Sequence, residues 1–281
     1  MNMLLWVAAV TAIAGVGGTG IGGLLSACFR KDSDRIVSLL LSFASGVMLS
    51  VVCMDLIPES IQEGKSSGLW LTIAGILIGF AVIFLLNHII DKKTNHEIPH
   101  IDPGHPKTAD GLDELIHFDH YEEHRKSRRN LFIAGVVMAC AIALHNLPEG
   151  MVIGAAYAAA PAEDAFTGSG FIMAVIIGLH NIPEGMSVAV PLISGGMRRW
   201  KAVLITALSG APTILGALLG YGIGVMGPVA LCLSLSFASG AMLYVVFGEL
   251  LPEAILMWRS KLPAFAAVIG MLAGLLIIFG G

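Results

Sequence analysis

Long runs of apolar residues, separated by short polar links, dominate the pattern along the chain. A helix needs about 20 apolar residues to cross the hydrocarbon layer, and only helices or closed barrels satisfy their backbone groups there. The runs are far too long for barrel strands, so the pattern predicts an all-α integral membrane protein with eight transmembrane helices. The predicted spans are residues 3–28, 36–62, 68–90, 130–158, 168–193, 200–224, 228–256 and 262–280.

Composition agrees with a membrane protein. Of 281 residues, 56% are hydrophobic and 13% are charged, whereas about one quarter of a soluble domain is charged. The net charge of -4, without a long basic run, excludes a nucleic-acid-binding protein. The four cysteines lack the short spacing of a CxxC metal site or a disulfide framework. No Lys or Arg precedes residue 30, so the first run is expected to be a retained span rather than a cleaved signal peptide.

The basic residues fall almost entirely on one side of this topology. With the N-terminus outside, fifteen of the sixteen Lys and Arg residues lie in the inner links, and only Lys65 lies in an outer link. Because basic residues concentrate in cytoplasmic links, this distribution predicts that both termini are extracytoplasmic. The same orientation makes the long polar segment 91–129, which holds six of the nine histidines, a cytoplasmic loop.

The chain contains a long internal repeat. Residues 41–61 (LSFASGVMLSVVCMDLIPESI) and 235–255 (LSFASGAMLYVVFGELLPEAI) are identical at 14 of 21 positions, and the same offset of 194 pairs Thr19 with Thr213. Spans 2 and 7 run in opposite directions, because five boundaries separate them. Spans 1–3 and 6–8 are therefore predicted to be inverted repeats in a 3+2+3 arrangement, which is characteristic of secondary transporters with a midplane site.

This arrangement divides the chain into four regions. They are residues 1–90, with the first three helices; 91–129, the cytoplasmic His-rich loop; 130–193, with helices four and five and the candidate metal site; and 194–281, the inverted repeat.

A second repeat supplies the candidate chemistry. Residues 143–151 read ALHNLPEGM and residues 178–186 read GLHNIPEGM, both near the middle of adjacent predicted spans. Ionisable side chains at that depth are costly and rarely without function. In each copy the His, Asn and Glu share one helical face, so two facing copies offer two imidazoles, two carboxylates and two amide oxygens to one divalent transition metal. The same set can also hold two metals if the glutamates bridge them. The candidate ligands are His145, Asn146, Glu149, His180, Asn181 and Glu184.

Further acidic residues suggest a path to and from this centre. Asp55 and Glu59 lie in the outer half of span 2, and Glu249 and Glu253 lie in the inner half of span 7. The alternative for Glu59 and Glu253 is an ordinary helix-end position at the membrane interface.

The pattern supports metal binding less strongly for Met48 and for three histidines of the polar loop. Met48 lies near mid-span, where its thioether is either a soft ligand or a core side chain. In the polar loop, His117, His120 and His124 fall on one side of a short potential helix, and either bind metal weakly or form a solvated tract.

The paired HNLPEG and HNIPEG motifs, flanked by the FASG…PE repeats and preceded by a His-rich loop, resemble the ZIP (ZRT/IRT-like) divalent-metal transporters, in particular their bacterial ZupT-like and GufA-like branches. The resemblance covers essentially all eight spans. It implies a 3+2+3 fold, metal movement into the cytoplasm across the cell inner membrane, and the six motif residues as ligands. It also implies a metal contact for Met48 and a carboxylate near the inner site for Glu249.

Two hypotheses of different class follow. The first is a carrier for zinc, iron, manganese, cobalt or cadmium that works by alternating access, is not an enzyme and needs no catalytic cofactor. The chain contains no GxxxxGK[ST] nucleotide-binding loop. The alternative is an intramembrane metal-dependent hydrolase or protease, although the HExxH spacing is absent. The expected partners are divalent metal ions and the lipid bilayer, and a homodimer is one of the assemblies left open.

Overall fold

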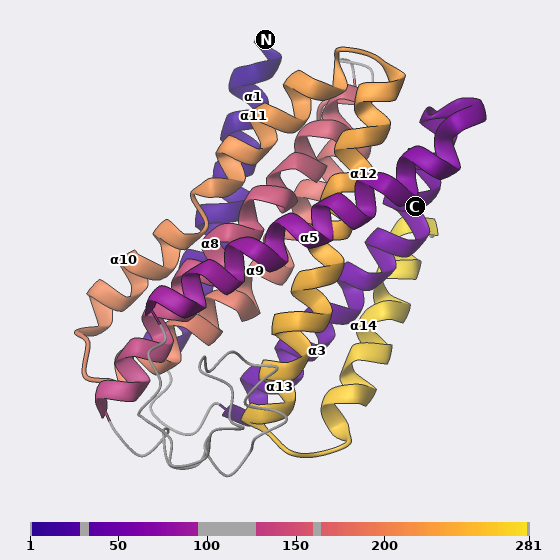
Figure 1. The fold of residues 1–281 in the computed structure, drawn as a ribbon. Helices are drawn as coiled ribbons and strands as arrows, with labels where there is room; N and C mark the ends of the chain where they lie inside the picture. The colour runs from indigo at the N-terminus through magenta and orange to yellow at the C-terminus, as the bar shows by residue number, and fades with distance from the viewer. Residues whose placement is uncertain (1, 29–33, 95–127, 160–163, 280–281) are drawn as a thin grey trace.

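The computed structural model describes residues 2–28, 34–94, 128–159 and 164–279 (Figure 1). The predicted loop histidines His117, His120 and His124 therefore lie outside the described residues. Within the described ranges, eight helices are long and apolar enough to cross a membrane, which confirms the predicted all-α fold and span count. The observed spans are Met3–Cys28, Arg35–Glu63, Lys65–Ile89, Gly135–Ala159, Ser169–Ser194, Arg199–Gly224, Pro228–Met257 and Leu262–Phe279.

Several spans consist of more than one helical segment. Span 1 comprises α1 (Met3–Ala12), η1 (Ile13–Gly17) and α2 (Gly18–Cys28); span 2 comprises α3 (Asp34–Val51), η2 (Val52–Leu56) and α4 (Ile57–Glu63), followed by η3 (Lys65–Ser67). Spans 3, 4 and 5 are α5 (Gly68–Thr94), α8 (Arg128–Ala159) and α9 (Ser169–Ser194). Span 6 comprises α10 (Arg199–Ser209) and α11 (Pro212–Gly224); span 7 comprises α12 (Pro228–Tyr244), η5 (Val245–Leu250) and α13 (Leu251–Met257); span 8 is α14 (Leu262–Phe279).

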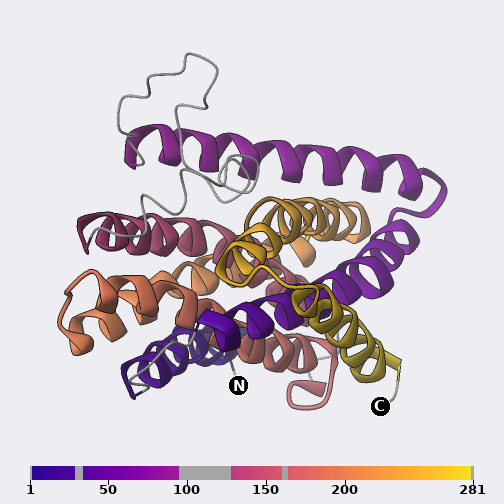
Figure 2. The ribbon, with the colours of Figure 1, turned by 90° about the horizontal axis from the view of Figure 1, so that it is seen from below.

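Spans 2, 4, 5 and 7 form the interior, and spans 3 and 8 lie at the rim. In the most apolar window of span 7, 72% of the residues are buried, against 17% in span 8. Viewed from below, α5 and α14 lie along the outside of the bundle (Figure 2). Their exposed side chains are large and apolar, as a lipid-facing surface requires.

The packing of the helices follows the internal repeat. α3 packs on α14 and α12 packs on α5, which are equivalent pairs under the exchange of the two repeats. At matching positions, a Cβ added to Gly46 would collide with the Ala267 carbonyl, and one added to Gly240 would collide with the Ile76 carbonyl. These glycines therefore permit close backbone contact at equivalent places.

The central spans show the same relationship. α9 packs on α2, and α8 packs on α11. A Cβ on Gly22 would collide with the Ile182 carbonyl, and one on the equivalent Gly216 would collide with the Leu147 carbonyl. The contacts thus pair as inverted repeats would require, while the 3+2+3 arrangement itself stays a prediction.

Both copies of the long repeat contain a π-helical turn ahead of a proline. The η2 turn precedes Pro58 and the η5 turn precedes Pro252, with each proline in the first turn of the next helix. Proline lacks an N–H group and its ring clashes with the carbonyl four residues earlier. A π-turn accommodates this disruption and changes the direction in which nearby side chains point. Asp55 and Glu249 lie in these two turns.

Candidate metal centre

The two HNxPEG motifs meet in the interior of the bundle. α8 and α9 pack against each other, and the His and Glu side chains of both motifs are almost completely buried. In each motif the His and Glu are four residues apart, so they lie on one face of their helix. The two motifs therefore bring their His and Glu side chains into one buried cluster.

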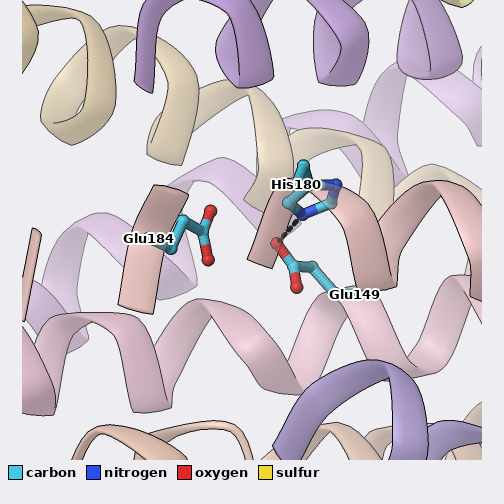
Figure 3. Close-up of side chains that lie close together, drawn as sticks. All are labelled: Glu149, His180 and Glu184. Atoms are coloured by element: carbon cyan, nitrogen blue, oxygen red, sulfur yellow. Dashed lines mark hydrogen bonds and ion pairs between the residues drawn. The ribbon is translucent and has the colours of Figure 1, made fainter. Parts of the chain in front are cut away.

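Three side chains form its centre, and Figure 3 shows them converging from α8 and α9. One ligand atom from each of Glu149, His180 and Glu184 lies within 4.8 Å of the others. His180 Nε2 lies 2.8 Å from Glu149 Oε1, within hydrogen-bonding distance. This spacing suits a metal ion that draws all three groups together.

His145 extends the group toward span 7. Its Nε2 lies 3.5 Å from Glu184 Oε2, an ion-pair distance. Its Nδ1 lies 3.3 Å from Glu249 Oε2. Span 7 thus contributes a carboxylate directly beside the motif residues, and Glu249 lies closer to the centre than its place in the inner half of span 7 indicated.

Several polar atoms at this centre have no hydrogen-bond partner. The buried atoms without a partner include both carboxylate oxygens of Glu184, Oε2 of Glu149 and Nδ1 of His180. A buried polar atom without a partner costs about 1–3 kcal/mol, and more when it is charged. The oxygen and nitrogen donors therefore fit a bound cation, which would supply the missing partner.

Comparison with known proteins identifies the chain. Residues 3–280 match the family model described as ZIP Zinc transporter. The chain belongs to this ZIP family. It is 32% identical over 275 residues to a protein named zinc transporter ZupT from Corynebacterium efficiens, covering 95% of this chain and 94% of that protein. It is 34% identical over 278 residues to the protein of the same name from Chlorobium luteolum, covering 96% and 94%.

The asparagines of the two ZIP motifs are placed differently. Asn146 Nδ2 donates to the carbonyls of Ile142 and Ser209, at 2.9 and 3.2 Å, and its Oδ1 accepts from Thr213 Oγ1 at 2.9 Å. Asn181 Nδ2 donates to the Ala14 carbonyl at 3.2 Å.

The two amide oxygens consequently differ in availability. Asn181 Oδ1 is buried without a partner, whereas Asn146 Oδ1 is held by Thr213. As arranged here, Asn181 is better placed to offer an oxygen ligand, and Asn146 joins α8 to α11. Ligation by either residue stays a prediction. The sequence pattern did not predict the Thr213 contact, although Thr213 matches Thr19 across the repeat.

The remaining candidates lie outside the central trio. Met48 is 1% exposed and packs in the main hydrophobic core, so its role as a ligand stays a prediction. Asp55 and Glu59 are partly exposed on η2 and α4, and Glu253 is partly exposed on α13. Their assignment to a metal path also stays a prediction.

Proposed function

We propose that this ZIP-family protein carries divalent transition-metal ions, with Zn²⁺ among them, across the membrane into the cytoplasm. The observation that carries the proposal is the buried Glu149–His180–Glu184 group, whose ligand atoms converge from two adjacent spans. Relatives over nearly the full chain length are named zinc transporters. The metal is cargo, so the site binds it reversibly.

The chemistry of the site defines the class of cargo. Two carboxylates, from Glu149 and Glu184, balance the charge of one dication. Imidazole nitrogen beside carboxylate oxygen suits Zn²⁺, Fe²⁺, Mn²⁺, Co²⁺ or Cd²⁺ better than Na⁺ or K⁺. His145 and Glu249 extend the set of nitrogen and oxygen donors toward span 7.

Alternating access follows from the internal repeat. Inverted repeats in secondary transporters surround a site near the midplane, which opens first to one side and then to the other. The matching glycine contacts on α3 and α12 support that relationship here. Asp55 and Glu59 would attract the cation on the outer side, and Glu253 on the inner side.

In the predicted orientation, the membrane potential favours entry of the metal ion into the cytoplasm. The protein lies in the cell inner membrane with both termini extracytoplasmic, as the distribution of Lys and Arg indicates. An inward dication gains about 4.6 kcal/mol per 100 mV of membrane potential, since each elementary charge contributes about 2.3 kcal/mol. Nothing in the comparisons supports the alternative of an intramembrane hydrolase, because the relatives are named as transporters. A homodimer stays a prediction.

Uptake by the full chain in proteoliposomes tests the function. Zn²⁺ entry should saturate with concentration and should fall to the background of empty liposomes in Glu149→Ala and in Glu184→Ala. Glu63→Gln is the matched control, because it removes a partly exposed acid at the end of α4 and should retain uptake. Uptake that persists in both alanine variants would show that the buried group is not the transport site.

A further inference from the structure

One contact at the metal centre breaks the symmetry of the two repeats. His145 Nδ1 lies 3.3 Å from Glu249 Oε2. The counterpart of His145 in the second motif is His180, and the counterpart of Glu249 across the long repeat is Asp55. His180 Nδ1 is buried without a hydrogen-bond partner, so Asp55 does not reach it in this conformation.

The packing around this contact is otherwise closely paired. Asn146 donates to the Ser209 carbonyl, and Asn181 donates to the Ala14 carbonyl, one residue before Gly15, which is the counterpart of Ser209 across the repeat. The glycine contacts of the two repeats also correspond. The unequal environments of the two histidines therefore do not reflect a general loss of symmetry.

A chain made of inverted repeats has two related conformations of similar free energy, in which the repeats exchange their local structures. Exchange converts a site open to one side into a site open to the other. A contact made by one repeat in the first conformation is then made by its counterpart in the second. In the present conformation, Glu249 supplies the acid to its motif histidine and Asp55 does not.

We infer that Asp55 is the positioning partner of His180, and that its carboxylate pairs with His180 Nδ1 in the conformation of opposite access. The inference rests on the proposed alternating-access function. During the cycle, the His145–Glu249 pair opens as the His180–Asp55 pair closes. Each pair stabilises one of the two conformations, and the carboxylate that is not paired lies toward the path of the ion.

The lengths of the two acids provide a test that conserves charge. Asp55→Glu adds one methylene group and should strengthen the His180 pair, whereas Glu249→Asp removes one and should weaken the His145 pair. Both changes should shift the protein toward the opposite conformation. Asp55→Asn should shift it toward the conformation described here, because the amide carries no charge to pair with the histidine.

Spin labels can report the populations of the two conformations. Cysteines at Ser66 in η3 and Gly222 in α11 would carry the labels, in a background whose four native cysteines are alanine. Ser66 is exposed, and a Cβ on Gly222 would meet nothing within 4 Å. Distance distributions would be measured on the full chain in lipid nanodiscs without metal.

We expect the ratio of the two conformations in Asp55→Glu and in Asp55→Asn to differ by about tenfold or more, because one hydrogen bond to a charged group has that effect on a two-state ratio. Glu249→Asp should shift the ratio in the same direction as Asp55→Glu. Glu63→Gln, which removes an acid whose repeat counterpart is Met257, should leave the ratio unchanged.

Two results would overturn the inference. One is that the two Asp55 variants give the same distance distributions. The other is that Glu249→Asp shifts the populations in the opposite direction to Asp55→Glu. Thermal unfolding of each variant verifies that it is folded. Metal uptake by the wild-type protein separates the two proposals: failed uptake contradicts transport, whereas the metal-free populations still test the pairing.

Discussion

Glu149 and His180 lie 2.8 Å apart, Oε1 to Nε2, and join adjacent spans within the bundle. The contact leaves Glu149 Oε2 and His180 Nδ1 buried without hydrogen-bond partners. The contact thus fixes the two side chains beside each other and leaves one donor atom of each available to an ion. An ion can therefore bind these atoms without first breaking the contact between Glu149 and His180.

Glu184→Gln should lower both stability and metal binding. Oε2 of Glu184 lies 3.5 Å from His145 Nε2, and neither carboxylate oxygen has a hydrogen-bond partner. Removing the charge therefore breaks a buried ion pair and should lower the melting temperature of the metal-free protein. The wild-type protein should gain about 2.7 kcal/mol of stability at a Zn²⁺ concentration 100 times its Kd, and the variant should gain almost none. Thermal unfolding with and without Zn²⁺ measures both effects. An unchanged Zn²⁺ response in Glu184→Gln would remove Glu184 from the site.

The two motif asparagines should respond differently to alanine. Asn146→Ala removes the hydrogen bonds to the Ser209 carbonyl and from the Thr213 hydroxyl, which keeps the Gly210 carbonyl as a partner. Unfolding should therefore become easier by about 1–3 kcal/mol. Asn181→Ala loses a single contact, with Ala14, and should destabilise less while weakening Zn²⁺ binding more. Melting temperatures and Zn²⁺ titrations of the two variants provide the comparison. Equal losses of affinity would contradict the distinction between the two amide oxygens.

The close contacts between helices should tolerate no added methyl group. Gly46→Ala and Gly240→Ala each force a Cβ against a backbone carbonyl of the facing helix, and each should cost about 1–3 kcal/mol through overpacking. Gly222→Ala meets open space and should be neutral or slightly stabilising, since alanine favours a helix. Unfolding in detergent should rank the three variants in this order. A neutral Gly46→Ala would mean that α3 and α14 separate readily.

Labelling can test the orientation. Cysteines at Ser66 and at Arg259, both exposed, lie in links on opposite sides of the predicted membrane. In a cysteine-free background, a membrane-impermeant maleimide should modify Ser66→Cys in intact cells and Arg259→Cys only after permeabilisation. The reverse result would place both termini in the cytoplasm.

Sequence patterns predicted much of this architecture because a bilayer imposes simple rules. Apolar length alone located all eight spans, and the i, i+4 spacing placed the His and Glu of each motif on one face. The pattern could not predict that Thr213 holds Asn146 or that Glu249 reaches His145. Those contacts depend on the rotation of each helix against its neighbours and on the π-turn ahead of Pro252, which change where a side chain points without changing its position in the sequence.

The position of α14 at the rim has a consequence for the surrounding lipid. This helix exposes large apolar side chains and packs on α3, the helix that carries Met48. A bilayer whose hydrocarbon thickness differs from the length of the rim helices would therefore act on α3, at a cost of fractions of a kcal/mol for each ångström of mismatch. Acyl chain length thereby becomes a variable that acts on turnover from the periphery of the protein.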